Sequence, residues 1–175
     1  MNTNANKNQT KRLVLAAMSA ALICIATMLF PIPIPATSGY VNLGDGFIFI
    51  AAALLGPLYG CLAGGIGSML ADILSGYAYY APATLIIKGL AGFVFALVFS
   101  KFSQKHAQVK ICFSIIISAL AGSLVISGGY FLYECILYGV KAAALSVPFN
   151  LLQNTVGLVL ATILFPFVKK IFREI

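Results

Sequence analysis

Long apolar runs, separated by short segments with glycine, proline or charge, dominate the pattern of this chain. A helix needs about 20 mostly apolar residues to cross the hydrocarbon core of a bilayer. We therefore expect six membrane helices. They would cover about 10–30, 43–56, 58–75, 82–100, 111–137 and 148–170.

The second and third of these runs are separated by only the turn "GPLYG", in which Gly56 and Pro57 end one helix and Pro57 can open the next. The run 58–75 is short for a full span, so a tilted helix is expected there. If the pair is instead a re-entrant hairpin, the count becomes five or seven.

Composition supports the membrane assignment. The chain is 61% hydrophobic and 9% charged, with a mean hydropathy of +1.02, whereas soluble domains are about 45–50% apolar and about 25% charged. We predict an all-α integral membrane protein with one domain over 1–175. The four cysteines lie singly in apolar runs, which is typical of packing residues and of neither a metal site nor a disulfide.

The basic residues predict the orientation. Of the eleven Lys and Arg, all but Lys88 and Lys141 fall in the N-terminal tail, the loop 101–110 or the C-terminal tail. By the positive-inside rule, both termini and this loop are cytoplasmic. The net charge of +7 then reflects topology, and nucleic-acid binding explains it poorly. A signal peptide is the alternative for the first run, which is long for one.

Three segments are then external: 31–46, 76–82 and 138–148. The first, "PIPIPATSGYVNLGDG", is extended and apolar, and we interpret it as a lid that contributes Tyr40 and Asn42 to a binding site. The second places three tyrosines together, of which Tyr80 is a candidate for stacking on a ring. The alternative is an aromatic belt at the membrane interface.

Ionisable residues interrupt the apolar runs at Asp72, Lys88 and Glu134. At mid-bilayer each charge costs at least about 2.5–3.5 kcal/mol, so such groups face a polar cavity or one another. Asp72 and Lys88 are expected at similar depth in the outer half. They either line a cavity there or form an ion pair that pins two helices. Asp45 is expected to cap the helix over 43–56 at its N-terminus.

Polar residues of the last two runs share helix faces. Tyr130 lies four residues before Glu134, and Asn150, Gln153 and Asn154 follow an i, i+3, i+4 pattern. This predicts an outward-facing pocket for a small polar aromatic ligand, with amide bonding between helices as the alternative. The candidate binding residues are Glu134, Tyr130, Asn150, Gln153, Lys88, Asp72, Tyr80, Tyr40 and Asn42.

Small residues recur at intervals of four in two runs. Ala16 and Ala20, and equally Ala17 and Ala21, form a shallow stripe that lets another helix approach, either within this protein or from a partner. A second row predicts tight packing of the helix over 58–75 against another helix; it consists of Gly60, Gly64, Ser68, Asp72 and Gly76.

Catalytic motifs are missing from the sequence. It has no G-x-x-x-x-G-K-[ST], no H-E-x-x-H and a single histidine, His106, in the basic loop. Ligands for a haem or a metal pair are lacking as well. A binding or transport protein is favoured over an enzyme, and active uptake would need energy from another subunit.

The run "YVNLGDGFIFIAAALLGPLYGCLAGGIGSMLADILSGYAYYAPATLIIKGLAGF", over about 40–93, resembles the S components of energy-coupling factor (ECF) vitamin transporters. The similarity is to the branch that includes the hydroxymethylpyrimidine, pyridoxine-type and riboflavin proteins. The paired alanines of the first run match the A-x-x-x-A motif by which S components dock onto the coupling subunit.

The resemblance implies a six-helix S-component bundle in the prokaryotic cell membrane, with a vitamin pocket near the outer surface under the first loop. It implies three partners: a transmembrane coupling subunit (EcfT) and two ATPase subunits (EcfA and EcfA'). These partners use ATP and Mg, and this chain carries no cofactor. The resemblance further implies that the S component topples in the membrane to carry its ligand inward.

For the ligand we expect hydroxymethylpyrimidine or a B6 vitamer, because the chain has short outer loops and no Trp. Riboflavin is the alternative substrate. A self-sufficient secondary carrier and a structural membrane subunit are the alternative functions.

Overall fold

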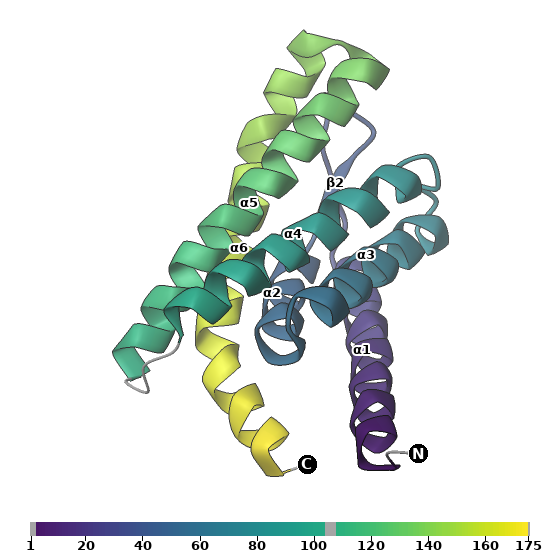
Figure 1. The fold of residues 1–175 in the computed structure, drawn as a ribbon. Helices are drawn as coiled ribbons and strands as arrows, with labels where there is room; N and C mark the ends of the chain where they lie inside the picture. The colour runs from purple at the N-terminus through teal and green to yellow at the C-terminus, as the bar shows by residue number, and fades with distance from the viewer. Residues whose placement is uncertain (1–2, 104–107, 175) are drawn as a thin grey trace.

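The computed structural model describes residues 3–103 and 108–174, and these residues form six helices and one β-hairpin (Figure 1). The hairpin pairs β1 (Ile32–Pro33) with β2 (Tyr40–Val41) in antiparallel register. The helices are α1 (Thr3–Leu29), α2 (Gly44–Leu55), α3 (Pro57–Leu74), α4 (Ala81–Phe102), α5 (Gln108–Tyr138) and α6 (Val140–Glu174).

Five of these helices are long and apolar enough to cross a membrane, and α2 is a shorter apolar helix. With 12 residues, α2 is about 18 Å long, against a hydrocarbon core of about 30 Å. The prediction of six helices is therefore confirmed, but the short member is α2 and not the run over 58–75. Side chains such as Leu124 (75% exposed) and Ile136 (82% exposed) lie on the outer surface, where lipid would cover them.

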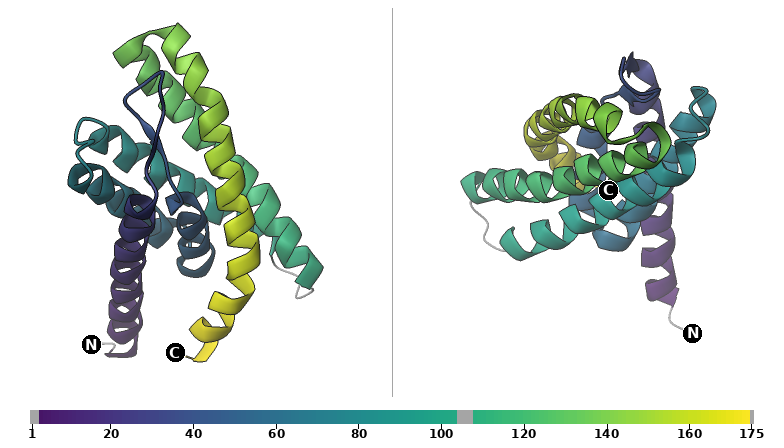
Figure 2. Two further views of the ribbon diagram at one scale, coloured as in Figure 1. Left: turned by 180° about the vertical axis from the view of Figure 1, so that it is seen from behind. Right: turned by 90° about the horizontal axis from the view of Figure 1, so that it is seen from above.

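The helices pack in a series, with α2 between them. α3 packs on α4, α4 on α5 and α5 on α6, while α1 packs on α3. The short α2 contacts α1, α3, α4 and α6. Figures 1 and 2 show both termini at one end of the molecule, with the β-hairpin and the α3–α4 turn towards the other.

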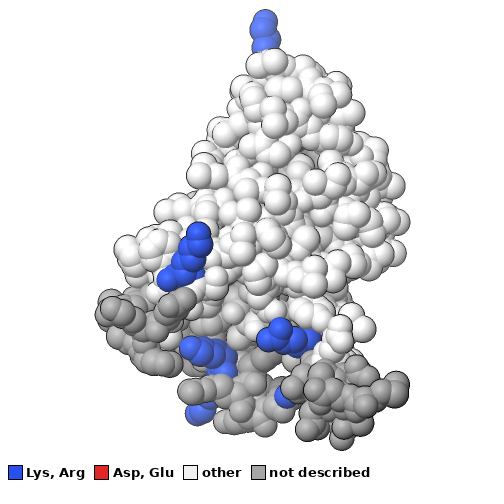
Figure 3. All heavy atoms as spheres, in the orientation of Figure 1, with Lys and Arg blue, Asp and Glu red and all other residues white. Residues whose placement is uncertain are grey.

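Lys and Arg side chains gather mainly near the end that carries the termini, and the face in Figure 3 shows no acidic side chain. Residues 104–107 of the basic loop over 101–110 lie outside the described residues. The cytoplasmic position of this end stays a prediction.

Glycines of α3 allow α2 to lie against it. Gly56 joins the two helices with φ +84°, a conformation that L side chains rarely adopt, and Pro57 opens α3. A Cβ atom on Gly60 would lie 2.6 Å from the Cα atom of Ala52, and one on Gly64 would lie 2.9 Å from Ile48. The first half of the predicted small-residue row therefore packs on α2.

The segment 138–148, expected as an external connector, is helical from Val140 onward. α6 begins directly after Gly139, which has φ +82°, and it continues through Pro148. The stretch "KAAAL" consists of strong helix formers, so the turn between α5 and α6 shrinks to a single residue. This places Ser146 on a helix beside Glu134.

Candidate functional site

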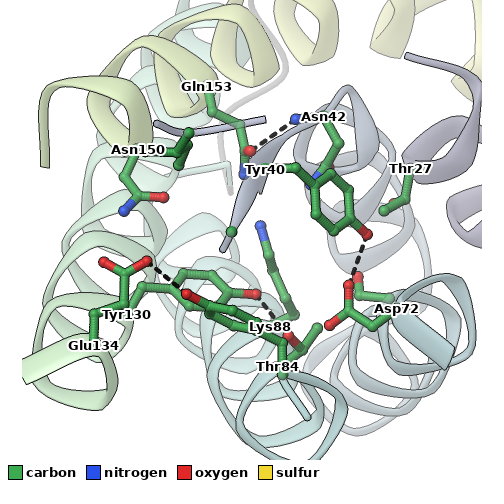
Figure 4. A pocket seen from close by; sticks show the side chains of 14 residues that line it. Thr27, Tyr40, Asn42, Asp72, Thr84, Lys88, Tyr130, Glu134, Asn150 and Gln153 are labelled. Atoms are coloured by element: carbon green, nitrogen blue, oxygen red, sulfur yellow. Dashed lines mark hydrogen bonds between the residues drawn. The ribbon is translucent and has the colours of Figure 1, made fainter. Parts of the chain in front are cut away.

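A polar cavity lies under the β-hairpin, between α1 and the four helices α3 to α6 (Figure 4). Its empty space is about 410 Å³, open mouth included. All nine candidate binding residues predicted from the sequence line it. The complete lining is Thr27, Ile34, Gly39, Tyr40, Asn42, Ser68, Asp72, Tyr80, Thr84, Lys88, Tyr130, Glu134, Asn150 and Gln153.

Lys88 pairs with Asp45 of α2 and not with Asp72. Its Nζ atom bonds Asp45 Oδ1, and both side chains are almost fully buried, at 2% and 0% exposure. The predicted alternative of an Asp72–Lys88 pair is therefore wrong. So is the cap by Asp45, because α2 is capped by Leu43 without a side-chain hydrogen bond. Asp45 lies inside the first turn, where its carboxylate faces α4.

The same carboxylate is bonded to Gln153 of α6, which in turn is bonded to the lid. Gln153 Nε2 donates to Asp45 Oδ2 at 2.7 Å, and the backbone N–H of Asn42 donates to Gln153 Oε1 at 2.8 Å. The buried chain Lys88–Asp45–Gln153–Asn42 thus joins α4, α2, α6 and the lid. A network with all of these partners in place gives the cavity a defined shape.

Glu134 of α5 lies on the opposite side of the cavity from Asp72 (Figure 4). Its Oε1 atom accepts a hydrogen bond from the Tyr80 hydroxyl at 3.1 Å, and its Oε2 atom accepts one from Ser146 of α6. Both carboxylate oxygens therefore have partners, one in the α3–α4 turn and one on α6. Beside them, the hydroxyls of Thr84 and Tyr130 are 2.9 Å apart.

Asp72 of α3 is less completely bonded. Its Oδ1 atom accepts a hydrogen bond from Tyr40 at 2.7 Å, but its Oδ2 atom, although buried, has no partner. Burial, followed by the charge of Asp72, raises the pKa of the Tyr40 phenol, so this group stays protonated and acts as the donor. Three other cavity-lining side chains also carry a buried, unpartnered polar atom: Thr27, Ser68 and Asn150.

The polar row on α6 has two roles. Asn150 and Gln153 line the cavity. Asn154 instead donates to Ser127 Oγ at 2.9 Å and to the carbonyl of Ser123 at 3.3 Å, both on α5. The first two residues therefore lie in the cavity wall, where their role in binding stays a prediction, and the third forms the amide bonding between helices that was the alternative.

The tyrosines of the α3–α4 turn also differ in role. Tyr80 lines the cavity. Tyr77 packs on the lid, with its ring centroid 4.4 Å from that of Tyr40, and the hydroxyl of Tyr79 donates to the Ser38 carbonyl at 2.9 Å. Two of the three tyrosines thus hold the lid in place.

Five lining residues were missed by the sequence analysis as binding candidates. Ser68 was expected to pack against another helix. It lines the cavity instead, because α2 packs on Gly60 and Gly64 and does not extend along α3 as far as Ser68. Ile34 and Gly39 lie in the predicted lid. Thr27 and Thr84 are single hydroxyls in apolar stretches, and no sequence signal distinguishes them.

The two alanine pairs of α1 face different ways. Ala16 and Ala20 are buried, at 5% and 8% exposure, and a Cβ atom on Gly67 of α3 would lie 2.5 Å from the Ala20 carbonyl oxygen. Ala17 and Ala21 are exposed. All four border an apolar groove whose empty space, open mouth included, is about 720 Å³. Its other lining residues are Leu13, Leu62, Ala63, Ile66 and Leu70.

Among the described residues, no three His, Cys, Asp or Glu side chains come together as a possible metal site. The fold and the cavity define a membrane-embedded helical protein with a lidded polar pocket, the form of a small-molecule binding subunit.

Comparison with known proteins gives the family. Residues 7–170 match the family model described as ECF-type riboflavin transporter, S component. The chain therefore belongs to the S components of ECF-type transporters, and it is a multi-pass protein of the cell membrane.

Relatives and a solved structure agree with this assignment. The thiamine precursor transporter HmpT of Lactococcus lactis subsp. cremoris (strain MG1363) is 32% identical over 166 residues, which cover 94% of this chain and 91% of HmpT. An uncharacterized protein of Pyrococcus woesei is 36% identical over 138 residues, or 79% of this chain and 88% of that protein. A solved S component of a bacterial ECF transporter shares the fold, with a TM-score of 0.69, 22% identity, and 94% and 98% of the two chains covered.

Proposed function

We propose that this S component binds a small aromatic vitamin or vitamin precursor, either hydroxymethylpyrimidine or a B6 vitamer, in the cavity under the lid. It captures the ligand outside the cell and topples to carry it inward, while partner ATPases supply the energy. The observation that carries the proposal is a buried cavity with carboxylate, amide and tyrosine side chains and several unpartnered polar atoms.

The size of the site favours a single ring. A Cβ atom on Gly39 would lie 3.2 Å from the Tyr80 hydroxyl and 3.4 Å from Glu134 Oε1, so the lid rests directly on these side chains. A small hydroxylated ring would therefore displace the lid less than a larger ligand would. The larger riboflavin would require the lid to move. Riboflavin is the second candidate because the matching family model bears its name.

The ligand can be identified by mass spectrometry of what co-purifies with the protein, followed by calorimetric titration with hydroxymethylpyrimidine, pyridoxine and riboflavin. We expect one of the two small rings to bind more tightly than riboflavin. Tightest binding of riboflavin would reverse the choice of substrate. Lack of binding by any vitamin would contradict the function and favour a structural subunit.

The proposed partners are EcfT and the ATPase subunits EcfA and EcfA'. Proteoliposomes test this dependence: the chain alone is expected to bind ligand but not to accumulate it, and accumulation should appear with the partners and ATP. Accumulation by the chain alone would favour a secondary carrier. The groove between α1 and α3 is the proposed docking site for EcfT, because its small side chains allow close approach of a helix.

Replacing Ala17 by Leu is expected to weaken co-purification with EcfT at least about tenfold, while ligand binding stays unchanged. The added side chain would fill the exposed part of the groove without touching the cavity. Ala144→Leu makes the same change on an exposed part of α6 and should have no effect. Equal assembly of Ala17→Leu and Ala144→Leu with EcfT would remove the groove from the interface.

A further inference from the structure

We propose that Thr27, Ser68 and Asp72 form a subsite that selects ligands bearing an amino or protonated nitrogen, and that it rejects anionic and phosphorylated forms. This subsite, which we name the α1–α3 wall, rests on the proposed function and specifies the ligand chemistry. It lies on helices that contribute no other side chain to the cavity lining.

Unpartnered polar atoms concentrate on this wall. Thr27 and Ser68 are each 2% exposed and Asp72 is 4% exposed. The Oγ1 atom of Thr27, the Oγ atom of Ser68 and the Oδ2 atom of Asp72 all lack a hydrogen-bond partner although all three residues line the cavity. Leaving a buried polar group unpaired costs about 1–3 kcal/mol, and more if it is charged. Groups kept at this cost next to an open space are expected to be paired by a ligand.

The charges decide what kind of ligand group fits. Asp72 and Glu134 are the acidic residues among the described lining residues, and Lys88 is the basic one. Lys88 is already bound to Asp45, so the α1–α3 wall has an excess of negative charge. An N–H donor would complete the bonding of Asp72 Oδ2. A carboxylate or phosphate would be repelled, because no uncommitted cation lines the described cavity.

The hydroxyls of Thr27 and Ser68 extend this pairing. A hydroxyl can donate as well as accept, so either can bond a ring nitrogen next to the ligand's amino group. Adjacent donor and acceptor atoms of this kind form the amino edge of an aminopyrimidine. On the opposite side of the cavity, the free Nδ2 atom of Asn150 would donate to the ligand's hydroxyl group (Figure 4).

Isothermal titration of the full chain with two probes tests the subsite. One is hydroxymethylpyrimidine with its ring amino group, and the other is the analogue with a carbonyl oxygen in place of that group. The wild-type protein should prefer the amino compound. In Asp72→Asn the affinity for this compound should fall about tenfold to a hundredfold, and the preference between the two probes should disappear.

Asn at position 72 still accepts the hydrogen bond from Tyr40, so the fold should persist. Because a buried carboxylate without a paired cation is replaced by a neutral amide, the ligand-free unfolding temperature should stay the same or rise. Ser68→Ala should also weaken binding of the amino compound. Ser118→Ala is the matched control, since Ser118 bonds the Ser114 carbonyl within α5 and lines no part of the cavity.

Different results would contradict different parts of the argument. Unchanged affinity and preference in Asp72→Asn, or a markedly lower ligand-free unfolding temperature with unchanged affinity, would overturn the subsite and leave the transport function intact. Wild-type binding of riboflavin alone, insensitive to Asp72→Asn, would do the same. Failure of the wild-type protein to bind hydroxymethylpyrimidine, pyridoxine or riboflavin would contradict the proposed function itself.

Discussion

Lys88→Met is expected to destabilise the protein by about 3–5 kcal/mol, because it leaves the carboxylate of Asp45 buried without a cation. Asp45 has 0% exposure and Lys88 has 2%. Gln153 still donates to Asp45, but an amide cannot neutralise the charge. Thermal unfolding in detergent micelles should show a large fall in midpoint temperature.

The double variant Lys88→Met with Asp45→Asn should recover most of this loss. Asn keeps an acceptor for Gln153 and removes the unpaired charge, and a matched neutral pair is often as stable as a buried ion pair. Lys141→Met provides the control, since Lys141 is exposed at the start of α6. If the single variant unfolded at the wild-type temperature, the Lys88–Asp45 pair would contribute nothing to stability.

Asn150→Ala is expected to weaken ligand binding by more than about tenfold with little change in stability. Its Nδ2 atom is buried in the cavity wall without a protein partner, so the ligand is the group that would lose a hydrogen bond. Titration calorimetry with the ligand identified by co-purification measures the effect.

Asn154→Ala is the matched control, one helical turn away on the same helix. Asn154 is bonded to α5 through Ser127 and the Ser123 carbonyl. Its loss should therefore lower the unfolding temperature and leave affinity almost unchanged. If both variants bound ligand like the wild-type protein, α6 would have no part in recognition through these amides.

The helical architecture could be predicted because it depends on local properties of the sequence. Every backbone polar group in lipid must be bonded within the protein, so an apolar run of sufficient length forms a helix whatever lies beside it. The lengths of the helices were less predictable. α6 begins as early as Val140 because the helix formers of "KAAAL" extend it towards its N-terminus. The hydrogen bond from Ser146 to Glu134 depends on how α6 packs against α5, which the sequence does not show.

The candidate residues were predictable for a similar reason. A polar side chain within an apolar run is costly unless it faces a cavity or a partner, and this cost alone singles out Asp72, Lys88 and Glu134. The pairing of these residues was not predictable. From its position in the sequence, Asp45 was expected to cap α2. In the structure, α2 packs against α1, α3, α4 and α6, and its first turn places Asp45 in contact with Lys88.

By itself the sequence determined that the chain lies in a bilayer, where its helices are and which polar residues must avoid lipid. Each of these follows from the free energy of placing a given side chain in a bilayer. Only the tertiary structure decided which of these residues pair and which stay free for a ligand. That choice depends on how far α2 extends along α3: Gly60 and Gly64 pack on α2, and Ser68 and Asp72, beyond its end, line the cavity.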